Sequence, residues 1–177
     1  MATDTWKIDT AHSSVTFSAR HMVVAKVHGA FKAWTGTLDL DTSDLTKSKV
    51  DVTIDTASID TRDEKRDGHL KSADFLDVEK YPTMHFKSKR VEKSGADTLK
   101  VIGDLALHGV TREVTLNVEY GGRAKDPWGG ERAGFTAQTK IERKEFGLQW
   151  NVALETGGVL VGDSIDVNIE IEAIKAD

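Results

Sequence analysis

The 177-residue sequence contains no cysteine, so disulfides, thiol catalysis and thiolate metal sites are excluded. It has only two prolines, Pro82 and Pro127, and long strand ladders can therefore run without interruption. It also lacks any run of five basic residues, and its formal net charge is −5. This charge pattern argues against nucleic-acid binding and predicts no strong attraction to anionic membranes.

Long apolar runs are missing as well. No stretch is long enough to span a membrane as a helix, and the first residues lack the apolar segment of an export signal. We therefore expect no stable membrane insertion and a cytoplasmic protein, or a periplasmic one if an export signal was removed. The chain has no low-complexity linker and suits one domain over residues 1–177.

The pattern that is present is alternation of apolar and polar residues, which is typical of antiparallel strands with one buried face. Its longest example runs from Thr98 to Tyr120 and folds back at residues 108–111. A strand of about eleven residues at ~3.3 Å each spans about 36 Å, and long antiparallel strands tend to close into a barrel. Further alternating segments lie at residues 15–19, 31–41, 50–55, 84–87, 132–141 and 165–172. The eight segments predict an all-β, eight-stranded antiparallel barrel.

One segment breaks the alternation. Residues 61–81 carry helix signals instead, because Thr61 and Glu64 have the spacing of a capping box and Pro82 forces a stop. We expect a short helical insertion around residues 62–81, lying across one mouth of the barrel.

Motifs for catalysis or metal binding are weak. The six histidines include no pair separated by one residue and none at helical i, i+4 spacing. The acidic residues between Asp60 and Asp67 suit a solvated helix start better than a pair of catalytic carboxylates. No nucleophile elbow, phosphate loop or dinucleotide motif occurs at a strand-to-helix junction. We expect no catalytic residue, no metal site and no cofactor.

Several short motifs, taken in order, cover nearly the whole chain. They run from Trp6 to Asp9 with His12 and Ser13, from His69 to Phe75 with Tyr81, Pro82 and Phe86, from Gly103 to Thr111, from Phe146 to Asn151, and from Gly162 to Glu172. In this order they make the sequence resemble the YceI-like family of bacterial lipid- or polyisoprenoid-binding proteins.

The resemblance implies an extended lipocalin-like β-barrel with a hydrophobic tunnel. It further implies non-enzymatic binding, transport or sequestration of a long-chain apolar lipid, such as a polyisoprenoid, an isoprenoid quinone or a fatty amide. A homodimer is compatible with this family.

An apolar lumen is what such a lipid tail requires, since burying each CH₂ contributes about 0.8 kcal/mol. The candidate wall residues are Phe17, Phe31, Trp34, Leu70, Phe75, Met84, Phe86, Leu105, Leu107, Phe135, Phe146 and Trp150. A head group would meet polar side chains at the mouth, for which the candidates are Arg20, His21, His28 and Arg143.

Two alternatives stay open, because alternation does not say which face of a sheet is the lumen. An enzyme acting on a small hydrophobic substrate would hold a histidine against a carboxylate inside the cavity. A stress-related module would fill the barrel with its own side chains and leave no continuous cavity.

Overall fold

The computed structural model describes residues 4–155 and 158–176. They form one 11-stranded antiparallel sheet and, within those ranges, one α-helix, α1 (Glu64–Lys71). The strands are β1 (Asp4–Ile8), β2 (Ser14–His21), β3 (Ala25–Phe31), β4 (Trp34–Leu40), β5 (Lys49–Asp55), β6 (Ile59–Asp60), β7 (Thr83–Lys93), β8 (Thr98–Leu107), β9 (Val110–Lys125), β10 (Glu131–Glu142) and β11 (Val161–Lys175). The short 3₁₀ helices are η1 (Thr10–His12), η2 (Leu45–Lys47), η3 (Thr56–Ser58) and η4 (Arg143–Phe146). In the described part of the chain, no helix combines the length and apolarity needed to cross a membrane.

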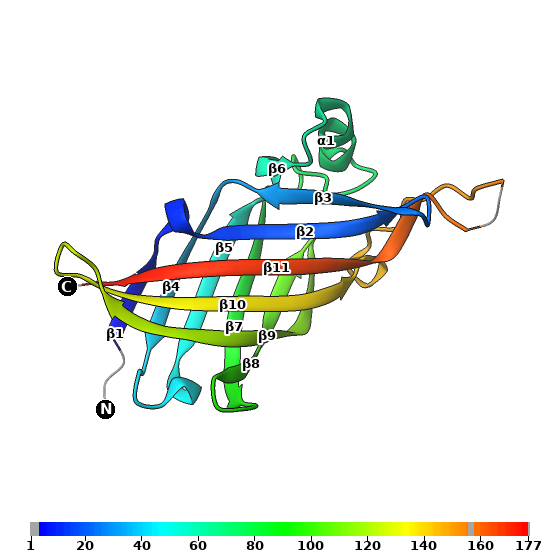
Figure 1. The fold of residues 1–177 in the computed structure, drawn as a ribbon. Helices are drawn as coiled ribbons and strands as arrows, with labels where there is room; N and C mark the ends of the chain where they lie inside the picture. Colours follow the sequence, from blue (N-terminus) through cyan, green and yellow to red (C-terminus); the bar gives the residue numbers. More distant parts are fainter. Residues whose placement is uncertain (1–3, 156–157, 177) are drawn as a thin grey trace.

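The sheet closes into a barrel because β1 pairs with β4 on one side and with β11 on the other. The closed ring runs β1–β4–β5–β7–β8–β9–β10–β11 and back to β1 (Figure 1). The predicted eight-stranded antiparallel barrel is therefore confirmed. The sequence pattern missed β1, β3 and β6, because β1 and β6 are short and β3 has little alternation around Gly29 and Ala30.

The two ends of the barrel are built differently. β1 and β2 lie one after the other along β11, with Ile8 paired to Ala173 and Ser14 paired to Glu170. At the β1 end the ring is complete, and we call it the closed end. At the β2 end the sheet instead continues through β3 and finishes at the two-residue strand β6. We call this second end the open end.

The segment between β6 and β7 lies at the open end, where α1 packs against β6 (Figure 1). The helix is shorter than the predicted insertion, and residues 72–81 continue as turns. Its cap also differs from the expected Thr61–Glu64 capping box. Asp63 is the N-cap and accepts hydrogen bonds from the Lys65 and Arg66 amides, while Thr61 donates to the Asp67 carboxylate. Asp63 prevails because it stands directly before the first helical turn.

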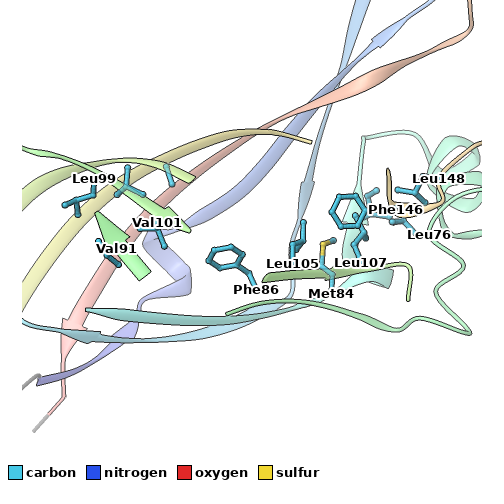
Figure 2. Packing of buried hydrophobic residues seen from close by; sticks show 13 residues of the cluster. Leu76, Met84, Phe86, Val91, Leu99, Val101, Leu105, Leu107, Phe146 and Leu148 are labelled. Atoms are coloured by element: carbon cyan, nitrogen blue, oxygen red, sulfur yellow. The ribbon is translucent and has the colours of Figure 1, made fainter. Parts of the chain in front are cut away.

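The core forms two clusters inside the barrel. At the closed end, Trp6 is 0 % exposed and packs with Leu38, Leu40, Ala133 and Ala173. Ala133 and Ala173 are opposite each other in the β10–β11 ladder, and their small side chains leave room for the indole. The second cluster follows the lumen toward the open end. Figure 2 shows its side chains in a row, with Val91, Leu99 and Val101 at one side and Leu76, Phe146 and Leu148 at the other.

Candidate functional site

The barrel encloses a cavity of about 740 Å³. Its length can be followed on β8, where Leu99, Val101, Leu105 and Leu107 line it. The eight residue steps from Leu99 to Leu107 cover about 26 Å at ~3.3 Å each. Because barrel strands tilt by roughly 40°, this corresponds to about 20 Å along the barrel axis. The cavity is therefore long and narrow rather than round.

The structure places every predicted wall residue except Phe146 on the cavity. Phe17 and Phe31 meet across the β2–β3 pair with ring centroids 5.4 Å apart. Phe146 is buried in the core cluster instead, because η4 ends there and turns its ring into the protein. Its carbonyl is within hydrogen-bond distance of His108 Nδ1, at 3.1 Å.

Sequence reasoning missed most of the aliphatic wall. These residues lie on the same alternating faces that predicted the strands. The alternation therefore contained the signal for them, but the prediction favoured aromatic side chains over aliphatic ones. They include Val15, Leu38, Val50, Val52, Ile54, Val91, Leu99, Val101, Val114, Leu116, Val118, Ala137, Ile141, Ile165, Val167, Ile169 and Ile171.

Polar lining residues gather at the open end. This group consists of Arg20 and His21 of β2, Thr61, Asp63, Lys65, Arg66 and His69 around α1, and Arg143 of η4, whereas Thr16, Ser48, Lys49 and Thr139 line other parts of the cavity. Arg66 is held in place, since its guanidinium donates to the Thr61 hydroxyl at 2.8 Å and to the Thr61 carbonyl at 2.7 Å. The mouth thus combines a polar rim with an apolar interior.

An aromatic contact joins the two segments that border this mouth. The His69 ring meets Trp150 edge-on at 4.6 Å and Phe75 at 5.1 Å between centroids. Its Nε2 atom lies 2.9 Å from the Asp74 carboxylate. Because Trp150 belongs to the loop between η4 and β11, this loop and the α1 segment are packed together across the mouth.

The Arg143 side chain anchors the same loop through hydrogen bonds. It is 2 % exposed and donates to the carbonyls of Leu148, Trp150, Val161 and Gly162 at 2.6–3.3 Å. Burial lowers the pKa of the Arg143 guanidinium, which Asp163 partly offsets. The four hydrogen bonds commit most of its five donors to the backbone.

The four residues predicted to contact a head group do not all lie together at the mouth of the cavity. Arg20 and His21 border the cavity at the open end. His28 does not reach it, because Val27 and Phe31 take the inward positions of β3 and His28 points to a polar groove on the outer surface. Arg143 borders the cavity, but its hydrogen bonds serve the loop.

Within the described residues, one group has the donor types of a metal site, namely Asp9, His12 and Glu172. Arg132 already places a cation there, donating to Asp9 at 2.9 Å and to Glu172 at 3.3 Å. Hydrogen bonds from His12 and Arg132 lower the pKa of Asp9. The group therefore works as an ion-pair network, and it lies at the closed end, away from the mouth.

Comparisons with known proteins agree with this architecture. A family model described as a YceI-like domain matches residues 6–173. A UPF0312 protein of Vibrio cholerae is 43% identical over 172 residues, covering 95% of this chain and 86% of that protein. The crystal structure of a Campylobacter jejuni YceI protein is similar with a TM-score of 0.76 at 34% identity, covering 89% of this chain and 90% of that one. A polyisoprenoid binding domain from Saccharophagus degradans shares the fold at 15% identity, with a TM-score of 0.69 and coverage of 97% and 98%.

Proposed function

The chain belongs to the YceI-like domain family, and we propose that it binds a long-chain apolar lipid, with the tail in the lumen and the head group at the open end. The observation that carries this proposal is the apolar cavity of about 740 Å³ along the barrel. The fold shared with a protein described as a polyisoprenoid binding domain supports it. Binding serves transport or sequestration of the lipid rather than its conversion.

The length of the lumen favours a long tail. The hydrocarbon core of a bilayer is about 30 Å thick, so the tail of an ordinary membrane lipid extends about 15 Å. A lumen of roughly 20 Å exceeds this, which favours a polyisoprenoid or an isoprenoid quinone over a shorter fatty amide. Each buried CH₂ contributes about 0.8 kcal/mol. Discrimination between similar tails should be weak, because one methylene is worth only ~1–3 kcal/mol.

The charges at the mouth favour a head group that is anionic or accepts hydrogen bonds. Arg20, Lys65 and Arg66 line this end of the cavity, and Asp63 is the carboxylate that lines it with them. Arg20 and His21 remain our candidates for contacting the head group, and Lys65 joins them. Arg143 acts by holding the loop that borders the mouth.

The two alternatives are less well supported. A self-filled barrel predicts no continuous cavity, which disagrees with the lumen. The enzyme alternative needs a histidine held by a carboxylate, and His69 with Asp74 has that form. However, both side chains are well exposed, and no hydroxyl of the described residues hydrogen-bonds to the His69 ring. We therefore assign this pair to packing of the mouth.

The proposal is tested by extracting the purified protein with organic solvent and identifying co-purified lipids by mass spectrometry. Stripped protein is then offered a detergent-solubilised polyprenyl lipid. We expect at least tenfold weaker uptake by Ala137→Trp, which places an indole in the lumen, and parental uptake by Gln138→Trp, whose side chain lies on the outer groove. Overpacking costs about 1–3 kcal/mol, so thermal unfolding must show that both variants are folded.

A protein that is repeatedly empty and takes up no polyprenyl lipid would refute the proposal. Equal uptake by the two tryptophan variants would place the lipid outside the lumen and refute it as well.

A further inference from the structure

Exposed apolar side chains gather on two neighbouring loops at the open end. In the β2–β3 turn, Met22, Val23 and Val24 are 46%, 56% and 83% exposed. In the loop before β11, Val152 and Val159 are 46% and 39% exposed. We call these five residues the apolar tip. Figure 1 shows both loops projecting past the barrel at the end opposite the two termini.

The two loops form one surface. The Met22 amide donates to the Leu160 carbonyl at 2.9 Å. The Val23 side chain lies close to Gly158, because a Cβ atom added at Gly158 would come within 2.7 Å of Val23 Cγ2. Ala153 and Val159 form a β-bridge that braces the second loop. The two loops that carry the five apolar side chains are therefore held side by side.

The turn holds its apolar residues against their conformational preference. Met22 and Val23 have φ angles of 53° and 68°, in the left-handed region that asparagine and glycine adopt more readily. A β-branched residue there costs on the order of 1–3 kcal/mol. Such a cost at an exposed position points to a role for the apolar side chains outside the folded core.

The tip is continuous with the mouth of the cavity. His21, Leu160 and Val161 line the cavity, and they are chain neighbours of Met22 and Val159. By contrast, Trp128 is 82% exposed but stands alone in the β9–β10 turn at the closed end. Single exposed apolar residues are ordinary on protein surfaces, so the cluster at the mouth is the informative one.

We propose that the apolar tip docks onto the surface of a lipid bilayer and lets a lipid tail pass between membrane and lumen without crossing water. This inference rests on the proposed function. Its physical reason is that each CH₂ exposed to water during transfer costs about 0.8 kcal/mol. A mouth seated among acyl chains removes that barrier.

A bilayer suits this surface better than a protein partner. A stable protein interface takes about 20–30 residues a side, whereas the tip presents five on two protruding loops. Interfacial apolar groups enter a bilayer by about 5–10 Å, which a loop tip can do without a matching groove. Arg20 and Lys26 flank the turn, while Glu155 lies in the other loop. These mixed charges make apolar burial, rather than attraction to anionic lipids, the source of binding.

The experiment uses the full chain and vesicles of phosphatidylcholine. The tip variant combines Met22→Ser, Val23→Asn and Val24→Ser, and Trp128→Ser is the matched control at the closed end. Three quantities are measured: co-flotation of the protein with vesicles, transfer of a polyprenyl lipid from vesicles, and uptake of the same lipid from detergent. We expect at least tenfold losses of flotation and transfer in the tip variant only, with unchanged uptake from detergent.

The outcomes separate the two proposals. If the parent protein does not float, or if the tip variant floats and transfers lipid like the parent, membrane docking is wrong. A parent dimer that the tip variant converts to a monomer would assign the surface to a second copy and also overturn it. If the parent takes up no lipid from detergent, the proposed function is wrong. In that case the flotation of the parent and of the tip variant still shows whether the apolar tip binds a bilayer. Thermal unfolding should show the tip variant at least as stable as the parent, because Val23→Asn relieves the turn.

Discussion

The sheet ends differently at the closed and open ends of the barrel. At the closed end, β1 completes the ring and Trp6 fills the lumen. There the partly buried cation Arg132 faces carboxylates. At the open end the sheet splays, and the buried cation is Arg143, which donates to backbone carbonyls of the loop before β11 and of the first residues of β11. One end is thus stabilised by packing and ion pairs, while the other is stabilised by hydrogen bonds and leaves the lumen accessible.

The sharpest test of this contrast is to remove one tryptophan from each end. We expect Trp6→Ala to lower the free energy of unfolding by about 3–5 kcal/mol, because a fully buried indole leaves a cavity that the closed ring cannot collapse. Trp150→Ala should cost no more than about 1.5 kcal/mol, since Trp150 is half-buried and its contacts are confined to the mouth. Urea denaturation measures both.

A third variant checks that volume is the cause. The Trp6 indole N–H is buried without a hydrogen-bond partner, so Trp6→Phe removes an unsatisfied donor while keeping most of the apolar burial. It should cost less than ~1.5 kcal/mol. A larger loss from Trp150→Ala than from Trp6→Ala would reverse the assignment of the stable end.

The second test targets the open end. Arg143→Met removes four hydrogen bonds, two to carbonyls of the loop before β11 and two to carbonyls at the start of β11, and leaving such groups unsatisfied costs about 1–3 kcal/mol. We expect amide hydrogen exchange to accelerate in the loop before β11, while β1 and the neighbouring residues of β11 stay protected. Arg143→Lys should not restore protection, because an ammonium group cannot reproduce the planar fork of donors. Uniform loss of protection along the chain would mean that the two ends are not independent.

The same contrast explains how far the sequence could predict the fold. Alternation found the long ring strands β4, β5 and β7–β11, because each has one face on the lumen and one on solvent. It missed β1 and β6 because strands of five and two residues are too short to show a clear alternation of apolar and polar residues. It could not predict the splaying either, since this depends on β1 and β2 sharing β11, a pairing between residues far apart in the sequence.

The site follows the same rule. Lumen residues such as Phe86 and Leu105 could be predicted, because facing inward depends on local alternation and on the family resemblance. The packing across the mouth could not, because the contact between His69 of α1 and Trp150 joins segments about eighty residues apart in the sequence. His28 shows the limit of proximity in sequence: it lies near His21 on the facing strand, yet its place in the alternation turns it outward.

The smallest expected effect is the response of the closed end to acid. Hydrogen bonds from the Gly130 amide and Arg132 lower the pKa of Asp126, and those from His12 and Arg132 lower the pKa of Asp9. A carboxylate with a lowered folded-state pKa adds stability that is fully present above its ordinary value of 3.8 and is lost as the pH falls through the folded-state value. We therefore expect the urea midpoint to hold from pH 7 to about pH 5 and to decline below pH 4.

Asp126→Asn keeps an acceptor for the turn amides but removes the charge that faces Arg132. The variant should start lower at pH 7 and approach the parent as the pH falls. If the difference between them instead widened in acid, the ion pairs of Arg132 would not be what stabilises the closed end, and packing around Trp6 would have to account for it alone.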